Sequence, residues 1–423
     1  MTMPALNISS PVDASAEILN YLEHAAQGLL RPASGQLKHP FIVPGAIYGN
    51  ELWDWDSYWT ARGMLELADQ LGDDTLRERV LTHGVGCIRN FFEHQSANGA
   101  IPIMMRADNP DVFGCLNEAG PEVNQAKPVI GQFALLLSDA LDDAKWFAPF
   151  LPRLAHFFQG WEQRYRSSIG LLVWGSDVGI GVDNDPTTWG RPDFSSANLL
   201  LNSLYLADLE AAATVAGRLG AQVLCAQWKQ RAAELGALIR ELCWDSRDRF
   251  FYTLDVQCAD HRAERIPWAK PGMPMEWRSL PIRIQAFTGF LPLWCGAASR
   301  IQAEATLAHL RDDDSFMAPY GVRTLSRAEP MFSLDASCNP SNWLGPVWIM
   351  ANYFVWQGLL RYGHADEAGR LADKTIRLLA QDIRQSGAIH EYYDPETGRP
   401  LMNKGFLSWN LLVLEMIRSR AGH

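Results

Sequence analysis

Residues 195–242 read SSANLLLNSLYLADLEAAATVAGRLGAQVLCAQWKQRAAELGALIREL. Leucine and alanine recur with a period near 3.6 on both sides of Leu219-Gly220, which predicts two amphipathic helices joined by a tight reversal. Residues 345–363 and 365–384 repeat this pattern around Gly363. The chain is therefore predicted to be built from helical hairpins.

The same periodicity predicts about twelve helices along the chain. Strand-like stretches are short and limited to residues 171–174 and 249–254, so the predicted fold class is all-α. The predicted helices are 16–30, 57–71, 74–94, 128–141, 144–166, 195–218, 221–242, 280–295, 298–311, 345–363, 365–384 and 405–420.

A polar and aromatic loop precedes every second predicted helix. If alternate helices form an inner ring of six, their N-termini point to one end and all these loops meet there, with free N–H donors and positive dipole ends. We therefore expect an (α/α)6 toroid in which short β-hairpins occupy the loops at the active-site end. It would be one catalytic domain spanning residues 1–423, with cap loops around 35–56 and 255–282. The six loops are 52–56, 124–128, 183–193, 276–283, 339–346 and 391–404.

Composition excludes several classes of partner. A net charge of −11 and the lack of a basic tract argue against nucleic acid and against an anionic membrane. The seven cysteines form no CxxC pair, which disfavours a disulfide framework and a zinc site. Neither a signal peptide nor a long apolar segment is evident. We expect a cytoplasmic protein without metal or cofactor, whose oligomeric state the sequence does not indicate.

Two short segments each place one carboxylate among turn and aromatic residues: GVDNDP at 181–186 and HEYYD at 390–394. Cleavage of a glycosidic bond requires one carboxylic acid that protonates the leaving oxygen and a second carboxylate that activates water or attacks carbon. The alternatives are an Asx-turn at Asp183 and a solvated hairpin residue at Glu391. Asp185 competes with Asp183 for the role of acid.

Tryptophan is unusually abundant, with 16 residues, several of them in clusters. Large rings often only fill a core. In the segment ELWDWDSYW, residues 51–59, however, aromatic and acidic residues alternate closely. Such a mixture suits a sugar, whose C–H faces pack on rings while its hydroxyls bond to carboxylates and amides.

Five segments, in order, resemble those of trehalases (glycoside hydrolase family 37) and of the related processing α-glucosidases of family 63. Together they span residues 45–410, nearly the whole chain. The matching segments are WDSYW at 55–59, QAKP at 125–128, GVDN at 181–184, SNWLGPVW at 341–348, and HEYYDP at 390–395 with Gly398.

The resemblance implies an inverting α-glycosidase on an (α/α)6 barrel, with Asp183 as general acid and Glu391 as general base. Further residues would contact the small-molecule sugar. Among these, Asp56 could instead cap a helix, residues 125–127 could simply precede an N1 proline, and Arg323 could form an ordinary salt bridge. The predicted sugar contacts are Tyr48, Trp53, Trp55, Asp56, Gln125, Lys127, Asn184, Arg323, Trp343, Gly345, Tyr392 and Lys404.

Departures from the family pattern bear on the substrate. Leu344 replaces an arginine, Val182 replaces an aromatic residue or methionine, and the arginine after the acid is displaced to Arg191. A trehalase-type Gln-Trp-Asp segment is missing. The chain then most resembles compact hydrolases of mannosylglycerate or glucosylglycerate. The alternatives are a trehalase or α-glucosidase acting on neutral disaccharides such as kojibiose, nigerose or trehalose and, less favoured, a sugar epimerase or binding protein.

The substrate is expected to be small. Loops 35–49 and 262–277 are long and rich in proline, glycine and aromatic residues, as lids over reactive sites often are. A cation could pair there with an aglycone carboxylate. The candidate cations are Arg262, Arg265, Lys270, Arg278 and Arg323.

Overall fold

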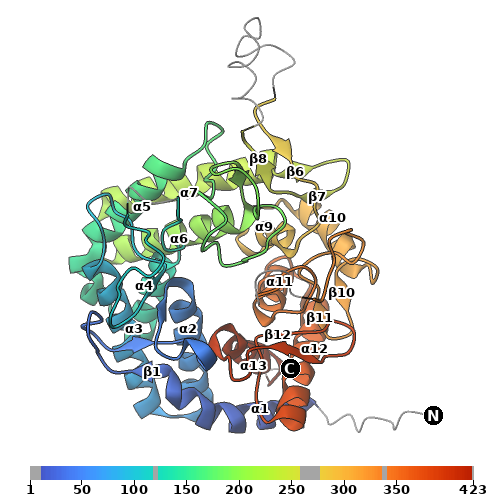
Figure 1. Ribbon diagram of the computed structural model, residues 1–423, viewed down its shortest axis with the longest axis horizontal. Helices are drawn as coiled ribbons and strands as arrows, with labels where there is room; N and C mark the ends of the chain where they lie inside the picture. Colours follow the sequence, from blue (N-terminus) through green and yellow to red (C-terminus); the bar gives the residue numbers. More distant parts are fainter. Residues whose placement is uncertain (1–10, 118–121, 258–276, 336–340, 422–423) are drawn as a thin grey trace, which may run out of the picture.

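The computed structural model describes residues 11–117, 122–257, 277–335 and 341–421, and Figure 1 shows its helices arranged in a ring. The α-helices are α1 (Pro11–Ala25), α2 (Asp54–Leu71), α3 (Asp74–Glu93), α4 (Ile130–Leu141), α5 (Leu151–Tyr165), α6 (Leu199–Arg218), α7 (Gln222–Leu242), α9 (Leu291–Trp294), α10 (Arg300–Arg311), α11 (Ile349–Arg361), α12 (Ala365–Ser386) and α13 (Val413–Ala421). Within these described ranges, five 3-10 helices accompany them: η1 (Ala26–Leu29), η2 (Ala46–Tyr48), η3 (Lys145–Phe150), η4 (Phe287–Phe290) and η5 (Ser408–Leu412).

The contacts among helices form a closed circuit. In chain order, α2 contacts α4, α4 contacts α6, α6 contacts α9, α9 contacts α11, α11 contacts η5, and η5 returns to α2. Helices α3, α7 and α12 pack on members of this circuit from outside. The last helices thus lie against the first, and the chain belongs to the α/α-barrel type.

Helix α6 shows how these sequences support a ring. Its alanine and leucine side chains are buried on nearly all sides because α4, α7 and α9 pack around it. Asn198 caps its first turn by accepting the N–H of Leu200 at 2.8 Å, which satisfies a donor that lacks an intrahelical partner. Among the described residues, α6 alone has the length and hydropathy of a membrane span, and 83% of that window is buried inside the fold.

The strands are short antiparallel pairs inserted between helices. They are β1 (Leu30–Arg31) with β2 (Phe41–Ile42), β3 (Leu52–Trp53) with β4 (Met104–Met105), β6 (Trp244–Asp245) with β7 (Phe250–Phe251), β10 (Met317–Ala318) with β11 (Gly321–Val322), and β12 (Tyr392–Tyr393) with β13 (Pro400–Met402). A three-stranded sheet has the order β5 (Ser196–Ala197), β8 (Leu254–Asp255), β9 (Leu280–Pro281).

The predicted helix at 280–295 is wrong over its first seven residues. Residues Leu280 and Pro281 form β9, which pairs with β8, and helical structure begins only at η4. Proline lacks the N–H that a helix interior requires, so Pro281 suits an edge strand better. Two further helices begin later than predicted: α6 begins at Leu199 and not at 195, and α11 begins at Ile349 and not at 345. In both cases the residues before the helix are extended and pair with neighbouring segments.

Candidate active site

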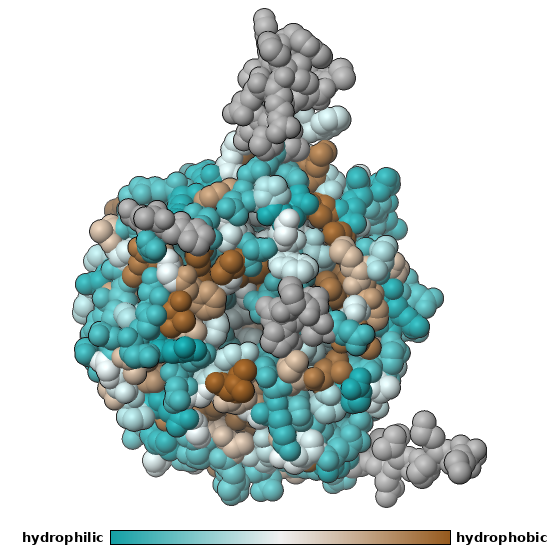
Figure 2. Space-filling view, viewed as in Figure 1, coloured by the Kyte–Doolittle hydropathy of each residue, from teal (hydrophilic) through white to brown (hydrophobic). Residues whose placement is uncertain are grey.

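A cavity of about 600 Å³ opens at one end of the ring. Figure 2 views the ring from the same side as Figure 1 and shows apolar side chains around a hollow near its centre. Five of the six polar-aromatic loops supply residues to the cavity wall, while the described part of loop 276–283 supplies none. The lining residues are Pro44, Tyr48, Trp53, Trp55, Asp56, Phe113, Lys127, Asp177, Val178, Gly179, Gly181, Asp183, Trp189, Ser341, Glu391, Phe406 and Trp409.

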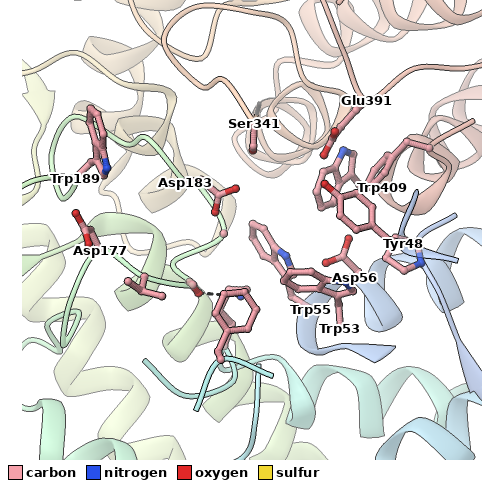
Figure 3. Close-up of a pocket in the computed structure, with 17 residues that line it drawn as sticks. Tyr48, Trp53, Trp55, Asp56, Asp177, Asp183, Trp189, Ser341, Glu391 and Trp409 are labelled. Atoms are coloured by element: carbon pink, nitrogen blue, oxygen red, sulfur yellow. Dashed lines mark hydrogen bonds between the residues drawn. The ribbon is translucent and has the colours of Figure 1, made fainter. Parts of the chain in front are cut away.

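Four acidic residues line this cavity, and three of them come from distant parts of the chain; the fourth, Asp177, lies six residues before Asp183. Asp56 lies in the first turn of α2, Asp183 lies in the loop before α6, and Glu391 directly precedes β12. In Figure 3 the Asp183 carboxylate stands on one side of the cavity, and Glu391 stands across from it. Asp183 and Glu391 thus have the placement that an acid and base on opposite faces of a sugar would need.

The loop that carries Asp183 is held by buried contacts on both sides of that residue. Asn184 accepts the N–H of Trp343 at 2.7 Å and donates to Asn342 at 3.0 Å. Gly181 has φ +87°, and a β-carbon there would lie 2.6 Å from the Trp55 ring, so glycine permits this close approach. The neighbouring Asp185 is buried and accepts from Thr187 and Asn198, and it does not line the cavity. The geometry favours Asp183 over Asp185.

Glu391 is positioned by the hairpin β12–β13 and by α12. Its N–H donates to the Met402 carbonyl at 3.0 Å, and its carboxylate accepts a hydrogen bond from Asn403. The adjacent His390 donates its backbone N–H to the buried Asp382 of α12 at 3.0 Å, and Tyr393 donates its hydroxyl to the same oxygen at 2.9 Å. Hydrogen bonds thus fix the backbone on both sides of Glu391, the candidate base.

Burial and mutual repulsion raise the pKa values in the cavity. Burial raises the pKa of Asp56 to about 7, helped by the charges of Asp54 and Asp183 and opposed by the Ser408 hydroxyl and Lys127. Burial likewise raises the pKa of Glu391 to about 8, with Asp56 and Asp183 adding to the rise and Asn403 opposing it. The pKa of Tyr48 is raised by burial and by the same carboxylates. At neutral pH the cavity thus holds protons that ordinary carboxyls would have lost.

Lys127 is the cation in the described lining of the cavity, and it is paired. Its ammonium group lies 3.0 Å from Asp54 Oδ2, with both side chains almost fully buried. The same group donates to the Gly179 carbonyl at 3.2 Å and lies 5.1 Å from the centre of the Trp55 ring.

The structure brings part of the predicted site together. Of the fourteen predicted residues, seven line the cavity: Tyr48, Trp53, Trp55, Asp56, Lys127, Asp183 and Glu391. The other seven predicted residues, all substrate contacts, do not line it: Gln125, Asn184, Arg323, Trp343, Gly345, Tyr392 and Lys404.

The residues outside the cavity have supporting positions. Arg323 is buried and donates to the carbonyls of Asp313 and Met317 at 2.8 Å each while pairing with Glu396, which is the salt-bridge alternative. Trp343 stacks on Trp348 at 3.8 Å, Trp348 stacks on Tyr392 at 4.7 Å, and the Trp348 ring lies 5.7 Å from the lining residue Trp409.

Four of the seven remain: Asn184 holds the loop of Asp183 as described above, and the other three have separate positions. Gln125 lines a different cavity beside Tyr165, and Lys404 donates to the Ser386 carbonyl at 2.7 Å. At Gly345 the φ of +138° and the nearby Phe332 ring explain glycine without any substrate.

Sequence reasoning missed several lining residues, of which Phe113, Asp177, Trp189, Ser341, Phe406 and Trp409 are polar or aromatic. Trp189 and Ser341 lie within predicted loops, so a search of whole loops would have included them. Trp409 lies in η5 and contacts Trp55 edge-on at 5.9 Å, a position that no short pattern indicated.

Because the folded state raises the pKa of Asp56 above its unfolded value, the protein binds this proton more tightly when folded. The resulting stability is fully present below about pH 4 and is lost as the pH rises through about 7. Asp56→Asn keeps an acceptor for Ser408 and removes this loss. We expect the variant to gain stability over wild type above pH 7, by about 4 kcal/mol at most, and little at pH 4. Denaturant unfolding at both pH values measures the difference, and a gain of equal size at both would contradict the assignment.

Comparison with known families gives a match over most of the chain. Residues 49–409 match the model described as mannosylglycerate hydrolase MGH1-like glycoside hydrolase domain. A mannosylglycerate hydrolase of Rubrobacter radiotolerans is 28% identical over 224 residues, which cover 52% of this chain and 43% of that protein. An uncharacterized protein of Borreliella burgdorferi is 26% identical over 313 residues, covering 73% of this chain and 58% of its own length. The chain thus matches about half of the length of these relatives.

Solved structures share the fold. The glucose complex of the GH63 mannosylglycerate hydrolase from Thermus thermophilus has a TM-score of 0.66 at 22% identity, covering 94% of this chain and 99% of that one. The neutral trehalase of Saccharomyces cerevisiae has a TM-score of 0.59 at 17% identity, covering 91% of this chain and 75% of that one. At such identities the likeness concerns the fold alone.

Proposed function

This chain belongs to the family of mannosylglycerate hydrolase MGH1-like glycoside hydrolase domains, within glycoside hydrolase family 63, and on that premise we propose that it is an inverting α-glycosidase of small substrates. One observation carries the proposal: two carboxylates from loops 208 positions apart in the chain, at Asp183 and Glu391, line opposite sides of one cavity. On the same family premise, we also propose that the closed circuit of helices described above is the (α/α)6 toroid.

The proposed reaction is a single displacement. Asp183 donates its proton to the glycosidic oxygen as the bond from that oxygen to the anomeric carbon breaks. Glu391 accepts a proton from a water molecule whose oxygen attacks the same carbon from the other face. An inverting pair leaves room for this water, with carboxyls roughly 6.5–9.5 Å apart. An α-linked substrate thus yields the β-anomer and the free aglycone alcohol.

The proposed substrates are mannosylglycerate and glucosylglycerate, supported by the family and by the names of its relatives. A cavity of about 600 Å³ suits a two-unit substrate. Of the cations expected to pair with the glycerate carboxylate, Arg323 is buried elsewhere and Arg278 is not a lining residue. Arg262, Arg265 and Lys270, with most of the expected cap at 255–282, lie outside the described residues.

The purified protein should hydrolyse a glycerate glycoside when screened with α-mannosylglycerate, α-glucosylglycerate, trehalose, kojibiose, nigerose and maltose. Proton NMR during the first minutes should show the β-anomer before mutarotation. No hydrolysis of any of these substrates would refute the function, and early release of the α-anomer would refute inversion.

Glucosylglycerol is the matched neutral analogue. If a carboxylate is recognised, kcat/KM should fall at least about tenfold without it, because the partner cation would be left unpaired. Equal kcat/KM values for glucosylglycerate and glucosylglycerol would contradict a carboxylate-binding site and would favour a neutral disaccharide as substrate.

A further inference from the structure

We propose that Trp189, held in place by Asp177, forms the wall that binds the aglycone and selects it. This inference rests on the proposed function and extends it to a side of the cavity for which the sequence indicated no residue. Both side chains line the cavity and belong to the loop that also carries Asp183.

The order of groups across the cavity determines which side receives the aglycone. In an inverting displacement the water enters beside the base, and the leaving group departs on the side of the acid. Figure 3 shows Asp183 between two sets of side chains: Glu391, Asp56, Trp409 and Tyr48 on one side, and Trp189 and Asp177 on the other. The sugar ring therefore faces the first set, and the aglycone faces Trp189.

Backbone hydrogen bonds fix Trp189 relative to the acid. Its N–H donates to the Asp185 carbonyl at 2.7 Å, so the ring follows the acid segment within a single turn. Asp177 accepts the N–H of Gly190 at 2.8 Å and thereby closes the loop on itself. Asp177 thus positions the loop that carries Trp189, and because it also lines the cavity we infer that its carboxylate accepts from the ligand as well.

The chemistry of this wall suits a hydroxylated aglycone of a few carbons. The Trp189 side chain is 43% exposed although it is large and apolar, so its ring can receive the C–H groups of a polyol or sugar. The labelled polar side chain next to Trp189 in Figure 3 is Asp177, whose carboxylate is a hydrogen-bond acceptor. Hydroxyl groups of the aglycone supply the matching donors.

A substrate without an aglycone isolates this contact. The variants are Trp189→Ala and Asp177→Asn, which keeps an acceptor for Gly190, with Ile301→Ala on α10 as an exposed apolar control outside the cavity. Each is assayed with α-mannosylglycerate and α-glucosylglycerate and with α-mannosyl and α-glucosyl fluoride, whose leaving group is a single atom. Thermal unfolding of each variant verifies the fold.

We expect Trp189→Ala to lower kcat/KM for the glycerate glycoside about ten- to a hundredfold, mainly through KM, and to affect the matching fluoride far less. Asp177→Asn should show the same direction with a smaller loss, and Ile301→Ala should resemble wild type on both. Equal losses on glycoside and fluoride, or no loss on the glycoside, would overturn the aglycone wall. If wild type cleaves neither substrate, the proposed function itself fails.

Discussion

Asp183→Asn and Glu391→Gln should each lower kcat by about three orders of magnitude or more while substrate binding persists. Both changes keep the size of the side chain, and the amide introduced by Glu391→Gln retains an acceptor for Asn403. What each removes is the ability to give or take a proton in the step that breaks the glycosidic bond. Single-turnover kinetics and calorimetric binding separate the chemical loss from any loss of affinity.

Glycosyl fluorides distinguish the two roles. Fluoride leaves without protonation, so Asp183→Asn should keep much of its activity on the fluoride, whereas Glu391→Gln should lose activity on both substrates. The comparison matters because burial raises the pKa of Glu391 to about 8, and a raised pKa is typical of a general acid. If Glu391→Gln retains fluoride hydrolysis and Asp183→Asn loses it, Glu391 is the acid and Asp183 is the base.

Exposed carboxyls serve as controls for these variants. Asp314→Asn and Glu78→Gln remove the same chemical groups outside the cavity and should leave kcat near the wild-type value. If Asp183→Asn or Glu391→Gln keeps more than a tenth of wild-type activity on the glycoside, the assignment of that residue is wrong.

Most helices could be predicted because their signal is local. The period of 3.6 and a reversal at glycine locate α6, α7, α11 and α12 within a few residues. The first part of the helix predicted at 280–295 failed for a tertiary reason, since β9 pairs with β8 and no local pattern records that pairing. Propensity is a weak guide wherever tertiary contacts decide the backbone.

The site shows the same division. Asp56, Asp183 and Glu391 could be predicted because each lies in a short segment that can be recognised in the sequence. All three line one cavity. Trp343 and Trp55 belong to equally recognisable segments, yet only Trp55 reaches the cavity, while Trp343 stacks on Trp348. Which face of an aromatic residue meets the ligand depends on packing between loops, and this the sequence does not encode locally.

Lys127→Met should destabilise the protein by about 3–5 kcal/mol, because it leaves the Asp54 carboxylate buried without its cation. Asp54 Oδ2 accepts from both the ammonium group and the backbone N–H of Lys127, while Oδ1 is buried without a partner among the described atoms. Removing the ammonium group removes the charge that compensates this burial. Denaturant unfolding near pH 7 measures the loss, with the exposed Lys145→Met as control, which should change stability by less than about 0.5 kcal/mol.

The double variant Asp54→Asn/Lys127→Met completes the test. It removes both charges, while the asparagine introduced at position 54 can still accept the backbone N–H of residue 127, so the double variant should recover a large part of the stability lost in Lys127→Met. Activity should not recover with it, because the ammonium group also holds the Gly179 carbonyl of the loop that carries Asp183 and Trp189. Restored stability with low kcat would identify Lys127 as the link between α2 and the acid loop. If Lys127→Met is as stable as Lys145→Met, the pair does not stabilise the fold. If the double variant has full activity, Lys127 does not support the acid loop.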